Sequence, residues 1–512
     1  MIVLDPKILT GEKPFEALSH DEILLKLKDQ CKKIDFQERV YPDCVKIKKE
    51  IQELTEKLKV QQTDIHAVDS IKAQIELHEK TLEDFKVKTK HYLIITIEEI
   101  MSTAKENNWA MCLNCGFVYL YNGQYWKAID KEGLTKFFGE IAELFSVPKF
   151  EARFYSFRES LLKQFIETAH LPRPVRTRRS ILINFRNGTL EIKSGKPVPV
   201  LRSFSSEDFL THQLPFDYEP SRVAPIWQNF LDFVLPDKER QNVLAEYFAS
   251  AFVNNEIVKL EKVLMMYGTG ANGKGVVYEV ICSLFGEENI SSYSLTSLTD
   301  SAGYYRAMIT NKLLNYSSEN GVKVDSNIFK QLASNEPVEA RLPYNPPFQA
   351  KNYAKLVFNT NMLPKDGVEQ TDAFFRRFLI VPFDVTIPEG SQDKELHLKI
   401  IGNELPGVFN WLMEGLNRLL KQKGFSECKA ATIKLVEYRN QSDSVREFLD
   451  EAGYIKSINS HSPMKSVYAE YKFYCSESGL REVSLKTFSN RLRDSGYETR
   501  KTMIGQLIYL TK

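Results

Sequence analysis

The sequence predicts an α/β protein, and three observations support this fold class. The apolar run Val263–Tyr267 leads into a glycine-rich loop, which leads into a helical pattern closed by Gly286. Two more apolar runs, Leu313–Ser318 and Lys355–Asn359, predict buried strands further along the chain. Long amphipathic helical patterns occur elsewhere in the chain. A strand, a glycine loop and a helix in that order place a ligand site at the end of a strand.

Length and composition fit a protein of about three domains. The net charge of +1 gives no global polyanion signature, so any surface for nucleic acid must be local. No apolar run reaches the roughly 18 residues of a membrane span, and the N-terminus lacks the pattern of a signal peptide. The seven cysteines are scattered and odd in number, which favours reduced thiols and a cytoplasmic protein.

One cysteine pair has the spacing of metal ligands. Cys112 and Cys115 form a C-x-x-C, but no second pair follows, and they occur in an apolar, strand-like stretch. Buried structural thiols are therefore favoured over a zinc site.

Residues 1–91 predict an α-helical, coiled-coil-like N-terminal region. No proline or glycine occurs between Asp43 and Thr89, and apolar residues recur there at helical spacing. A break near Gln61–Asp64 would give two long amphipathic helices that form a hairpin. Such helices pack, mediate oligomer contacts or lie along DNA, and the charge pattern leaves these roles open.

Residues 92–260 predict a mixed α+β domain. Asn122-Gly123 stands between two apolar runs, which is a strong signal for a two-residue β-hairpin turn. A second strand–turn–strand pattern turns at residues 186–189, and a helical pattern over 223–260 leads into the glycine-loop strand. A basic cluster before this second hairpin is either a solvated face or a phosphate contact. It consists of Arg173, Arg176, Arg178 and Arg179.

The most specific motif is the glycine loop, which reads G-x-x-x-x-G-K. With a strand before it and a helix after it, it predicts a phosphate-binding loop. The expected nucleotide-binding residues are Gly268, Thr269, Gly270, Ala271, Asn272, Gly273, Lys274, Gly275 and Val276. Backbone N–H groups, the helix N-terminus and Lys274 would face the phosphates. Gly275 stands where a hydroxyl residue usually ligates Mg²⁺, so either other groups hold the metal or hydrolysis is slow.

ATP hydrolysis also needs an acid, a polar sensor of the γ-phosphate and often an arginine from a neighbouring subunit. Glu319 follows a predicted strand and is the expected catalytic acid and metal ligand; the alternative is a capping or surface carboxylate. Asn361 follows the next strand as a candidate sensor, although an asparagine there also forms turns. Arg376 and Arg377 precede a further strand and could reach a neighbour's ATP, whereas paired arginines alone are usually surface charge.

Residues 440–512 predict a separate C-terminal domain. Helical patterns followed by two strand-like runs are the order of a winged helix. From Ser484 onward, six basic residues stand against two acidic ones, a local positive bias in a neutral chain. Lys486, Asn490 and Arg493 share one helical face and, with Arg500, are the expected DNA contacts. An ordinary solvated helix is the alternative.

The order of these pieces resembles superfamily 3 helicases, specifically the C-terminal part of phage and plasmid primase-helicases, which are related to the poxvirus primase-helicase. The matching residues in the core are Gly268–Lys274 (Walker A), Ser318-Glu319 (Walker B), Phe329–Arg341 (leading into the pre-sensor hairpin), Asn359–Asn361 (motif C), Asp372, and Arg376-Arg377. Upstream, Asn187–Ile192, Leu214–Tyr218 and Phe230–Asp237 resemble the domain that precedes the helicase. The resemblance covers about residues 180–512.

The resemblance implies an AAA+-like P-loop ATPase core at residues 261–385. A pre-helicase domain (92–260) would precede it, and a helical connector (386–439) and the winged helix (440–512) would follow. It implies a homo-hexamer that binds ATP and Mg²⁺, hydrolyses ATP, and moves on single-stranded DNA in a central pore, with duplex DNA at the winged helix. The protein would serve DNA replication in a host cytoplasm if it is encoded by a phage.

A hairpin would enter that pore. By the resemblance, it carries the DNA-binding residues Arg341, Tyr344, Asn345 and Lys351, since charge and aromatic stacking grip single strands. A proline-rich surface turn is the alternative.

Two residues depart from the family's pattern. Gly275 replaces the usual hydroxyl residue and Ser318 replaces an acid, so Mg²⁺ has few evident protein ligands. No convincing metal-binding carboxylate cluster of a primase occurs in residues 1–180, so a primase is absent or carried on another chain.

Three functions follow from these patterns. The first is an ATP-dependent hexameric DNA helicase or replication initiator of a mobile element. The second is a DNA-binding loader or scaffold that binds ATP and barely hydrolyses it. The third is a P-loop small-molecule kinase, which the C-terminal domain and the position of the arginines disfavour.

Overall fold

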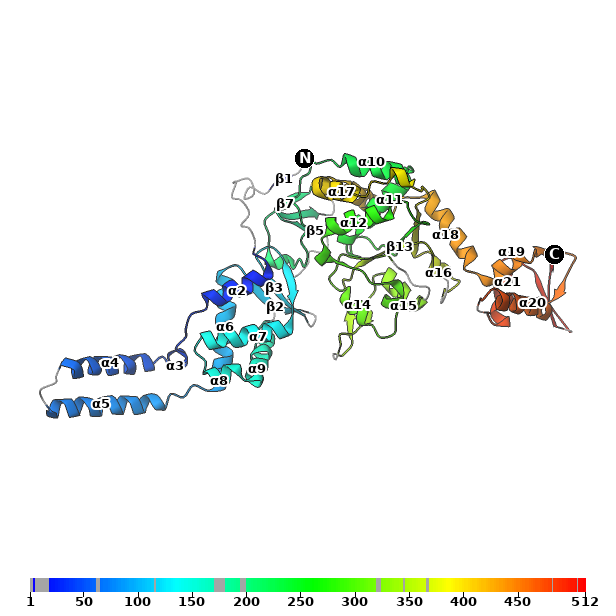
Figure 1. The fold of residues 1–512 in the computed structure, drawn as a ribbon. Coiled ribbons are helices and arrows are strands. Elements are labelled where there is room, and N and C mark those ends of the chain that lie inside the picture. The colour runs from blue at the N-terminus through cyan, green and yellow to red at the C-terminus, as the bar shows by residue number, and fades with distance from the viewer. Residues whose placement is uncertain are drawn as a thin grey trace. The chain divides into compact units, whose positions relative to one another are not determined.

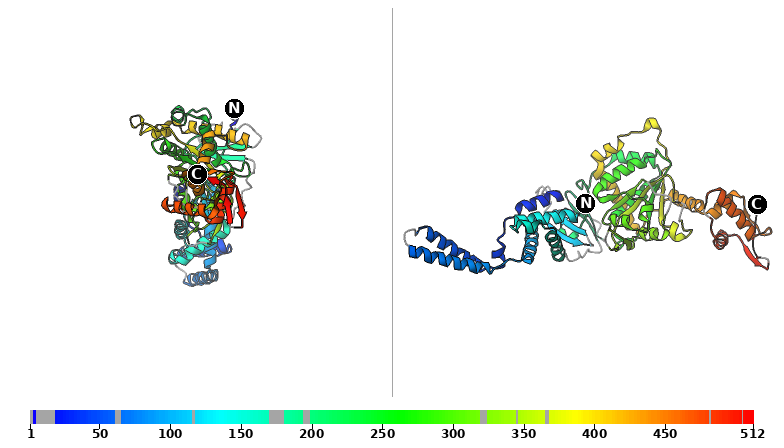
Figure 2. Two further views of the ribbon diagram at one scale, coloured as in Figure 1. Left: turned by 90° about the vertical axis from the view of Figure 1, so that its right-hand side faces the viewer. Right: turned by 60° about the horizontal axis from the view of Figure 1, so that its bottom comes forward.

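The computed structural model divides into two compact units (Figures 1 and 2). It describes residues 3–4, 18–60, 65–114, 117–169, 180–193, 199–318, 324–343, 346–364, 368–480, 482–503 and 505–512. The first unit contains residues 1–177, 187–191 and 198–213, and the second contains residues 178–186, 192–197 and 214–512. The finer five-part division of the sequence stays a prediction.

A two-helix hairpin is the first large feature of unit 1. Helices α4 (Cys44–Val60) and α5 (Ile65–Glu83) lie side by side in Figures 1 and 2, and half-buried apolar side chains meet along their seam. Across the seam, the Glu50 carboxylate lies 3.7 Å from Nε2 of His78. The two long helices predicted from the sequence are confirmed, and the break predicted at Gln61–Asp64 lies outside the described residues.

The rest of unit 1 packs helices around a small antiparallel sheet of order β2-β3-β4. The helices are α2 (His20–Gln30), α3 (Phe36–Val40), α6 (Thr89–Glu106), α7 (Lys131–Leu144), α8 (Lys149–Arg153) and α9 (Tyr155–Thr168). The strands are β2 (Ala110–Asn114), β3 (Phe117–Tyr121) and β4 (Trp126–Ile129). Ile100, Leu120, Phe138 and Phe165 belong to their shared core and are fully buried.

The predicted hairpin at Asn122-Gly123 is confirmed, but its loop has four residues, 122–125, in place of the predicted two. Tyr121 pairs with Trp126 across it, and the Asn122 side-chain oxygen accepts the N–H groups of residues 124 and 125 at 3.0 and 2.9 Å. Gly123 takes φ +93°, a left-handed value that glycine adopts without strain. Cys112 on β2 is buried, and burial raises the pKa of its thiol to about 12. Cys115 lies outside the described residues.

The chain also contains several shorter elements. They are β1 (Val3–Leu4), β5 (Ser180–Phe185), β6 (Gly188–Lys193), β7 (Val200–Arg202) and the 3₁₀ turns at Ser206–Asp208, Ser250–Phe252, Glu287–Asn289 and Glu389–Ser391. A two-residue turn separates β5 from β6, where the sequence predicts the second hairpin. The four arginines that precede β5 lie outside the described residues.

Unit 2 is built on a five-stranded parallel sheet of order β14-β8-β13-β10-β9. The strands are β8 (Val263–Tyr267), β9 (Ile290–Ser291), β10 (Leu314–Ser317), β13 (Lys355–Thr360) and β14 (Phe378–Pro382). Successive residues of β8, β10 and β14 are buried, because both faces of the sheet are covered. The α/β class predicted from the sequence is confirmed, and the carboxyl ends of the strands meet at one edge.

Helices cover this sheet. They are α10 (Pro225–Val234), α11 (Lys238–Ala249), α12 (Lys274–Phe285), α13 (Leu295–Leu298), α14 (Tyr304–Met308), α15 (Ser326–Ala333), α16 (Asp372–Phe375), α17 (Leu396–Gln422) and α18 (Lys429–Gln441). Helix α17 packs against α10, α11 and α12. A Cβ at Gly415 would lie 2.6 Å from the carbonyl carbon of Ala245, and one at Gly407 would lie 2.4 Å from that of Val223. Glycine at these two positions therefore permits the close approach.

Helix α18 links the sheet to the C-terminal part of unit 2. It packs on β14, and the hydroxyl of Tyr438 donates to the carbonyl of Pro364 at 2.7 Å. At the end of α18, the side-chain amide of Gln370 donates to the Ser442 carbonyl at 2.7 Å. The next residue, Asp443, caps α19 and forms an ion pair with Arg491 at 3.0 Å.

The C-terminal part of unit 2 has helices followed by a β-hairpin, in the order that the sequence predicts. Its helices are α19 (Ser444–Glu451), α20 (Met464–Glu477) and α21 (Leu485–Asp494). Its strands are β15 (Ile455–Lys456), β16 (Ser462–Pro463), β17 (Thr499–Thr502), β18 (Gly505–Ile508) and β19 (Leu510–Thr511). They pair as β16-β18-β17 and β15-β19. Phe448, Tyr471 and Phe488 meet in its core, with 4.8 Å between the last two rings.

A buried carboxylate ties α11 to α17 and to the loop after it. Glu246 is fully buried and accepts from Arg418 Nε at 3.1 Å, and from Ser426 N and Oγ at 2.7 and 2.6 Å. We expect Glu246→Ala to lower the free energy of unfolding by about 3 kcal/mol, because three donors lose a buried acceptor. Denaturant unfolding measures this. Glu414→Ala on the exposed face of α17 is the control, and an equal effect of both variants would contradict the expectation.

Among the described residues, no helix combines the length and the apolar character that crossing a membrane requires.

Candidate nucleotide site

The glycine loop joins the carboxyl end of β8 to the start of α12. Gly270 and Gly273 take φ +118° and +82°, left-handed values that favour glycine. Gly268 is required for space, because a Cβ there would lie 2.1 Å from Nδ2 of Asn272 and 2.7 Å from the Phe383 carbonyl oxygen. The glycines that the sequence singles out are therefore needed for the shape of the loop.

Lys274 is the first residue of α12, and its side chain is buried within the loop. Its ammonium donates to the Gly268 carbonyl at 2.7 Å and to Oδ1 of Asn272 at 3.0 Å. Burial lowers the pKa of Lys274. Asn272 Nδ2 donates in turn to the Phe383 carbonyl at 3.1 Å, which ties the loop to the segment after β14. The cation therefore lies where a phosphate group on the loop would be a stronger acceptor than these neutral oxygens.

A cavity of about 810 Å³ lies against the loop. Its lining consists of Gly270–Val276 from the loop and α12, Asn359 and Asn361 from the end of β13, Glu279, Ile226, Asn229, Phe230 and Phe233 from α10, and Ile387, Ser391–Lys394, Leu396 and His397 from the segment before and into α17. Gly268 and Thr269 are not among the lining residues, although both were predicted to bind the nucleotide. The size and the mixture of polar and apolar groups suit a nucleotide.

The apolar side of the cavity was missed by sequence reasoning. Phe230 and Phe233 both line it, and Phe233 is 52% exposed. Phe230 occurs in the helical pattern predicted over 223–260, on one face with Trp227, Leu231 and Val234. A helical period shows which residues share a face and does not show whether protein or ligand covers that face. The signal in the sequence is Phe233, an aromatic residue that stands outside that face.

Two asparagines at the end of β13 differ in their surroundings. Asn361, the predicted sensor, is exposed and lines the cavity. Asn359 is buried; its Oδ1 accepts from the Tyr316 hydroxyl at 3.2 Å, and its Nδ2 lies 3.5 Å from the Lys274 carbonyl. Asn359 therefore links β10, β13 and the start of α12. The signal for it was an asparagine within an apolar strand, since a buried amide needs partners.

The predicted acid, Glu319, lies outside the described residues. Ser318, directly before it, is exposed at the end of β10. Strand β10 is the neighbour of β13, and β13 is the neighbour of β8. The strand that precedes Glu319 thus ends at the same edge of the sheet as the glycine loop.

Arg376 and Arg377 lie at the opposite end of the sheet, where the strands begin. They precede β14, which runs parallel to β8 from Phe378 opposite Val263 to Pro382 opposite Tyr267. The Arg377 guanidinium is buried, donates to Ser334 Oγ at 3.1 and 3.0 Å, and also bonds the Ala373 carbonyl.

The Arg376 side chain is 62% exposed and lies 3.9 Å from the carboxylate of Glu261. Only Arg376 of the two is therefore accessible to another molecule.

The predicted pore hairpin contains β11 (Val338–Ala340) and β12 (Phe348–Ala350), which pair antiparallel. The Arg341 N–H donates to the Gly303 carbonyl at 3.2 Å, and Lys351 is exposed. The predicted contacts Tyr344 and Asn345 lie outside the described residues.

The predicted DNA contacts of the C-terminal part are all exposed. Lys486, Asn490 and Arg493 follow one another at spacings of four and three along α21, so they share a face. Arg493 donates to Oδ1 of Asn490, and Arg500 is exposed on β17. Arg491, between them, is instead held by Asp443.

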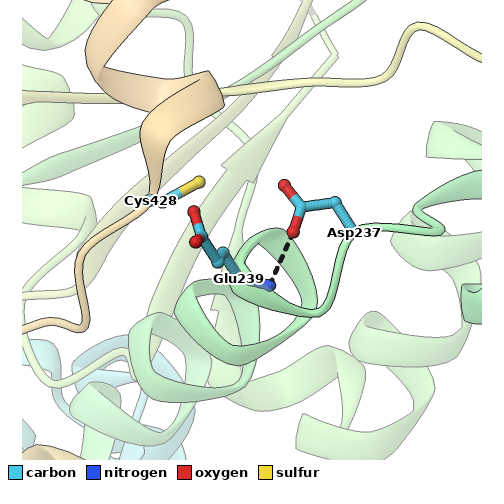
Figure 3. Close-up of side chains that lie close together, drawn as sticks. All are labelled: Asp237, Glu239 and Cys428. Atoms are coloured by element: carbon cyan, nitrogen blue, oxygen red, sulfur yellow. Dashed lines mark hydrogen bonds between the residues drawn. The ribbon is translucent and has the colours of Figure 1, made fainter.

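Figure 3 shows a second group of polar side chains, Asp237, Glu239 and Cys428, whose ligand atoms lie within 4.8 Å of one another. Asp237 caps α11 by accepting the Glu239 N–H at 2.9 Å and lies 3.4 Å from Arg240 Nε. The Glu239 carboxylate accepts the Lys429 N–H at 2.9 Å, and burial raises the pKa of the Cys428 thiol. These contacts explain the cluster as the junction of α11 with α18.

Three family models match this chain. D5 N terminal like matches residues 90–236, Poxvirus D5 protein-like matches residues 440–506, and a family of unknown function, DUF5906, matches residues 266–377. The third match contains the glycine loop, β10 and β13.

Solved structures of the C-terminal region of NrS-1 are also similar. An apo A form covers 80% of this chain and 98% of its own length at 13% identity and a TM-score of 0.46. Another apo structure covers 82% of this chain and 98% of its own length at 12% identity and a TM-score of 0.41. These TM-scores carry no conclusion by themselves.

The two D5-like matches flank the glycine-loop core on both sides, as the motif order within the sequence implies. These two regions of the chain are therefore similar to the D5-like family of phage and poxvirus primase-helicases.

Proposed function

We propose that this chain is an ATP-driven DNA helicase of a phage or mobile element, with an AAA+-like core that works as a homo-hexamer. The observation that carries the proposal is the cavity at the edge of the parallel sheet. It is lined by the glycine loop, by Lys274 and by Asn361, and β10, the strand that precedes Glu319, ends at the same end of the sheet. The protein would hydrolyse ATP in a host cytoplasm and translocate along single-stranded DNA.

ATP would occupy the cavity with its phosphates on the loop. The loop N–H groups and the Lys274 ammonium would bind the β- and γ-phosphates, and Phe230 and Phe233 offer apolar rings for the base or ribose. Glu319 would accept a proton from the attacking water, and Asn361 would orient the γ-phosphate.

Mg²⁺ would be held mainly by Glu319, water and the phosphates. Gly275 offers no side-chain oxygen, and the carboxylates among the described lining residues are Glu279 and Asp393. When bound, the metal would neutralise phosphate charge.

The sheet geometry supports a role of Arg376 in trans. The P-loop and Arg376 lie at opposite edges of one parallel sheet, so Arg376 cannot serve the ATP of its own chain. In a ring of identical subunits, an exposed arginine at that edge can face the nucleotide of the next subunit. Arg376 would fill that role, and buried Arg377 would support the fold.

The DNA contacts would come from two places. The β11–β12 hairpin, with Arg341 and Lys351, would contact a single strand in the pore, and the exposed face of α21, with Arg500, would contact duplex in a winged helix. A primase activity would come from another chain.

ATP hydrolysis by the purified protein tests the proposal. We expect turnover to rise when single-stranded DNA is added and to fall with added salt, because salt competes with phosphate contacts. Strand separation should follow in an unwinding assay. ATP hydrolysis that ignores DNA at every salt concentration would contradict a DNA motor.

A second function, an ATP-binding loader or scaffold with weak hydrolysis, is favoured by Gly275. We expect Gly275→Ser to raise turnover roughly tenfold in that case, because a hydroxyl would add a metal ligand. The site has room, since a Cβ at Gly275 would have nothing within 4 Å. Steady-state hydrolysis at saturating ATP measures this, with Gly275→Ala as the control for helix propensity. An equal rate in the serine and alanine variants would exclude a missing ligand.

A further inference from the structure

Unit 1 exposes three aromatic rings within six residues. Phe150, Phe154 and Tyr155 are 88%, 56% and 68% exposed. They lie on α8 and at the start of α9, and the last two rings are 4.9 Å apart. Single exposed apolar residues are common, but three large rings together form a surface that needs an explanation. We call these three residues the aromatic patch.

The aromatic patch is additional to the core-facing side of the same helices. Ala152, Phe157, Leu161 and Phe165 are buried and anchor α8 and α9 in the core of unit 1. Phe150 lies on α8 and Phe154 directly follows this helix, and neither residue belongs to the buried core. The exposed rings are therefore held on a fixed base and are not needed to build it.

Positive charge surrounds the patch. Lys149 and Arg153 occur on α8 itself, and Lys86, Lys88 and Lys90 are exposed at the start of α6. A hydrogen bond of 2.7 Å from Thr89 Oγ1 to the Glu151 carboxylate places the start of α6 beside α8. The Glu151 carboxylate on α8 accepts from Thr89, Arg153 pairs with Glu143 of α7, and Glu159 on α9 is exposed.

The lysines at the start of α6 are unfavourable for the helix itself. The first turn of α6, which is fully described, has no acidic residue and contains Lys90, and Lys88 is its N-cap. Cations at a helix N-terminus oppose the helix dipole and reduce helix stability. An anion bound across α6 and α8 would compensate both the dipole and the lysine charges.

We propose that the aromatic patch, together with Lys86, Lys88, Lys90 and Lys149, binds single-stranded nucleic acid. Unpaired bases would stack on the rings, while phosphates would contact the lysines. A duplex buries the faces of its bases, so it would not use the rings. Protein interfaces are enriched in aromatic residues but depleted in lysine, so the lysines around the rings favour a nucleic acid.

This inference is separate from ATP hydrolysis and from the pore hairpin. The test uses the full chain without nucleotide and a fluorescent oligothymidylate of roughly 16 nucleotides. We expect Phe150→Ala/Phe154→Ala/Tyr155→Ala to raise the Kd about tenfold or more. Basal ATP hydrolysis should stay unchanged, so failure here leaves the proposed function intact. Leu77→Ala is the control, because Leu77 is 65% exposed on α5 without neighbouring aromatic residues in sequence.

Two further measurements separate stacking from general stickiness. Phe150→Trp should retain binding and Phe150→Leu should lose it, because only the ring stacks on a base. An oligonucleotide that carries 5-iodouracil should crosslink to the segment from Lys149 to Arg158 in the parent protein. An unchanged Kd in the triple variant, or equal binding by the leucine variant, would overturn the proposal. So would a changed oligomer mass with unchanged Kd, which would assign the patch to contacts between copies.

Discussion

Lys274→Ala is expected to lower ATP hydrolysis at least about a hundredfold. The Lys274 ammonium is the one full positive charge that the glycine loop carries, and its burial strengthens any interaction with a phosphate. Alanine removes the charge and leaves the backbone N–H groups, so weak nucleotide binding should survive while turnover is lost. A steady-state assay at several ATP concentrations separates the two effects.

The control for this variant is Lys394→Ala. Lys394 lines the same cavity from the segment before α17 and lies outside the loop. We expect it to change the KM more than kcat, since it would contact ATP without touching the transferred group. Undiminished turnover in Lys274→Ala would refute the assignment of the loop.

Arg376→Ala is expected to lower kcat about a thousandfold and to leave ATP binding nearly unchanged. An arginine from a neighbouring subunit stabilises charge that develops in the transition state, so its loss affects the chemical step. Arg377→Ala should act differently. Arg377 is buried on Ser334 and Ala373, so its removal should lower the free energy of unfolding by about 2 kcal/mol.

Mixed assemblies test whether Arg376 acts in trans. A subunit with Lys274→Ala still carries Arg376, and a subunit with Arg376→Ala still carries Lys274. Mixing the two inactive variants should restore part of the activity, because some interfaces then combine an intact loop with an intact arginine. If mass measurements show that the variants have mixed and no activity is recovered, Arg376 does not act on a neighbour's ATP.

Local patterns predicted much of the fold because they act over short stretches. Continuous apolar runs predicted β8, β10 and β13. Asn122-Gly123 predicted a hairpin that the structure confirms, although its loop has four residues and the predicted turn has two. The order in which those strands pair depends on contacts between distant segments and has no local signature. Strand β9 has only two residues and was not predicted for the same reason.

The site residues also differ in whether a local sequence pattern could reveal them. The loop glycines and Lys274 could be found, because phosphate binding needs those residue types at fixed spacing. Arg376 and Arg377 look alike in the sequence, and only the packing of Arg377 on Ser334 distinguishes them. Phe233 was missed, and Asn359 was named only as part of motif C, because their roles come from surfaces assembled by α10, β10 and β13.

Helix α18 connects the parallel sheet of unit 2 with its C-terminal helices, so the two parts can be energetically coupled. The Tyr438 hydroxyl donates a hydrogen bond to the carbonyl of Pro364, which is three residues after Asn361. Asp443, just beyond α18, forms an ion pair with Arg491 of α21. A change in the turn that carries Asn361 would therefore alter the support of α21 through a short series of contacts. If nucleotide changes the affinity of α21 for DNA by some factor, DNA must change the affinity for nucleotide by that same factor.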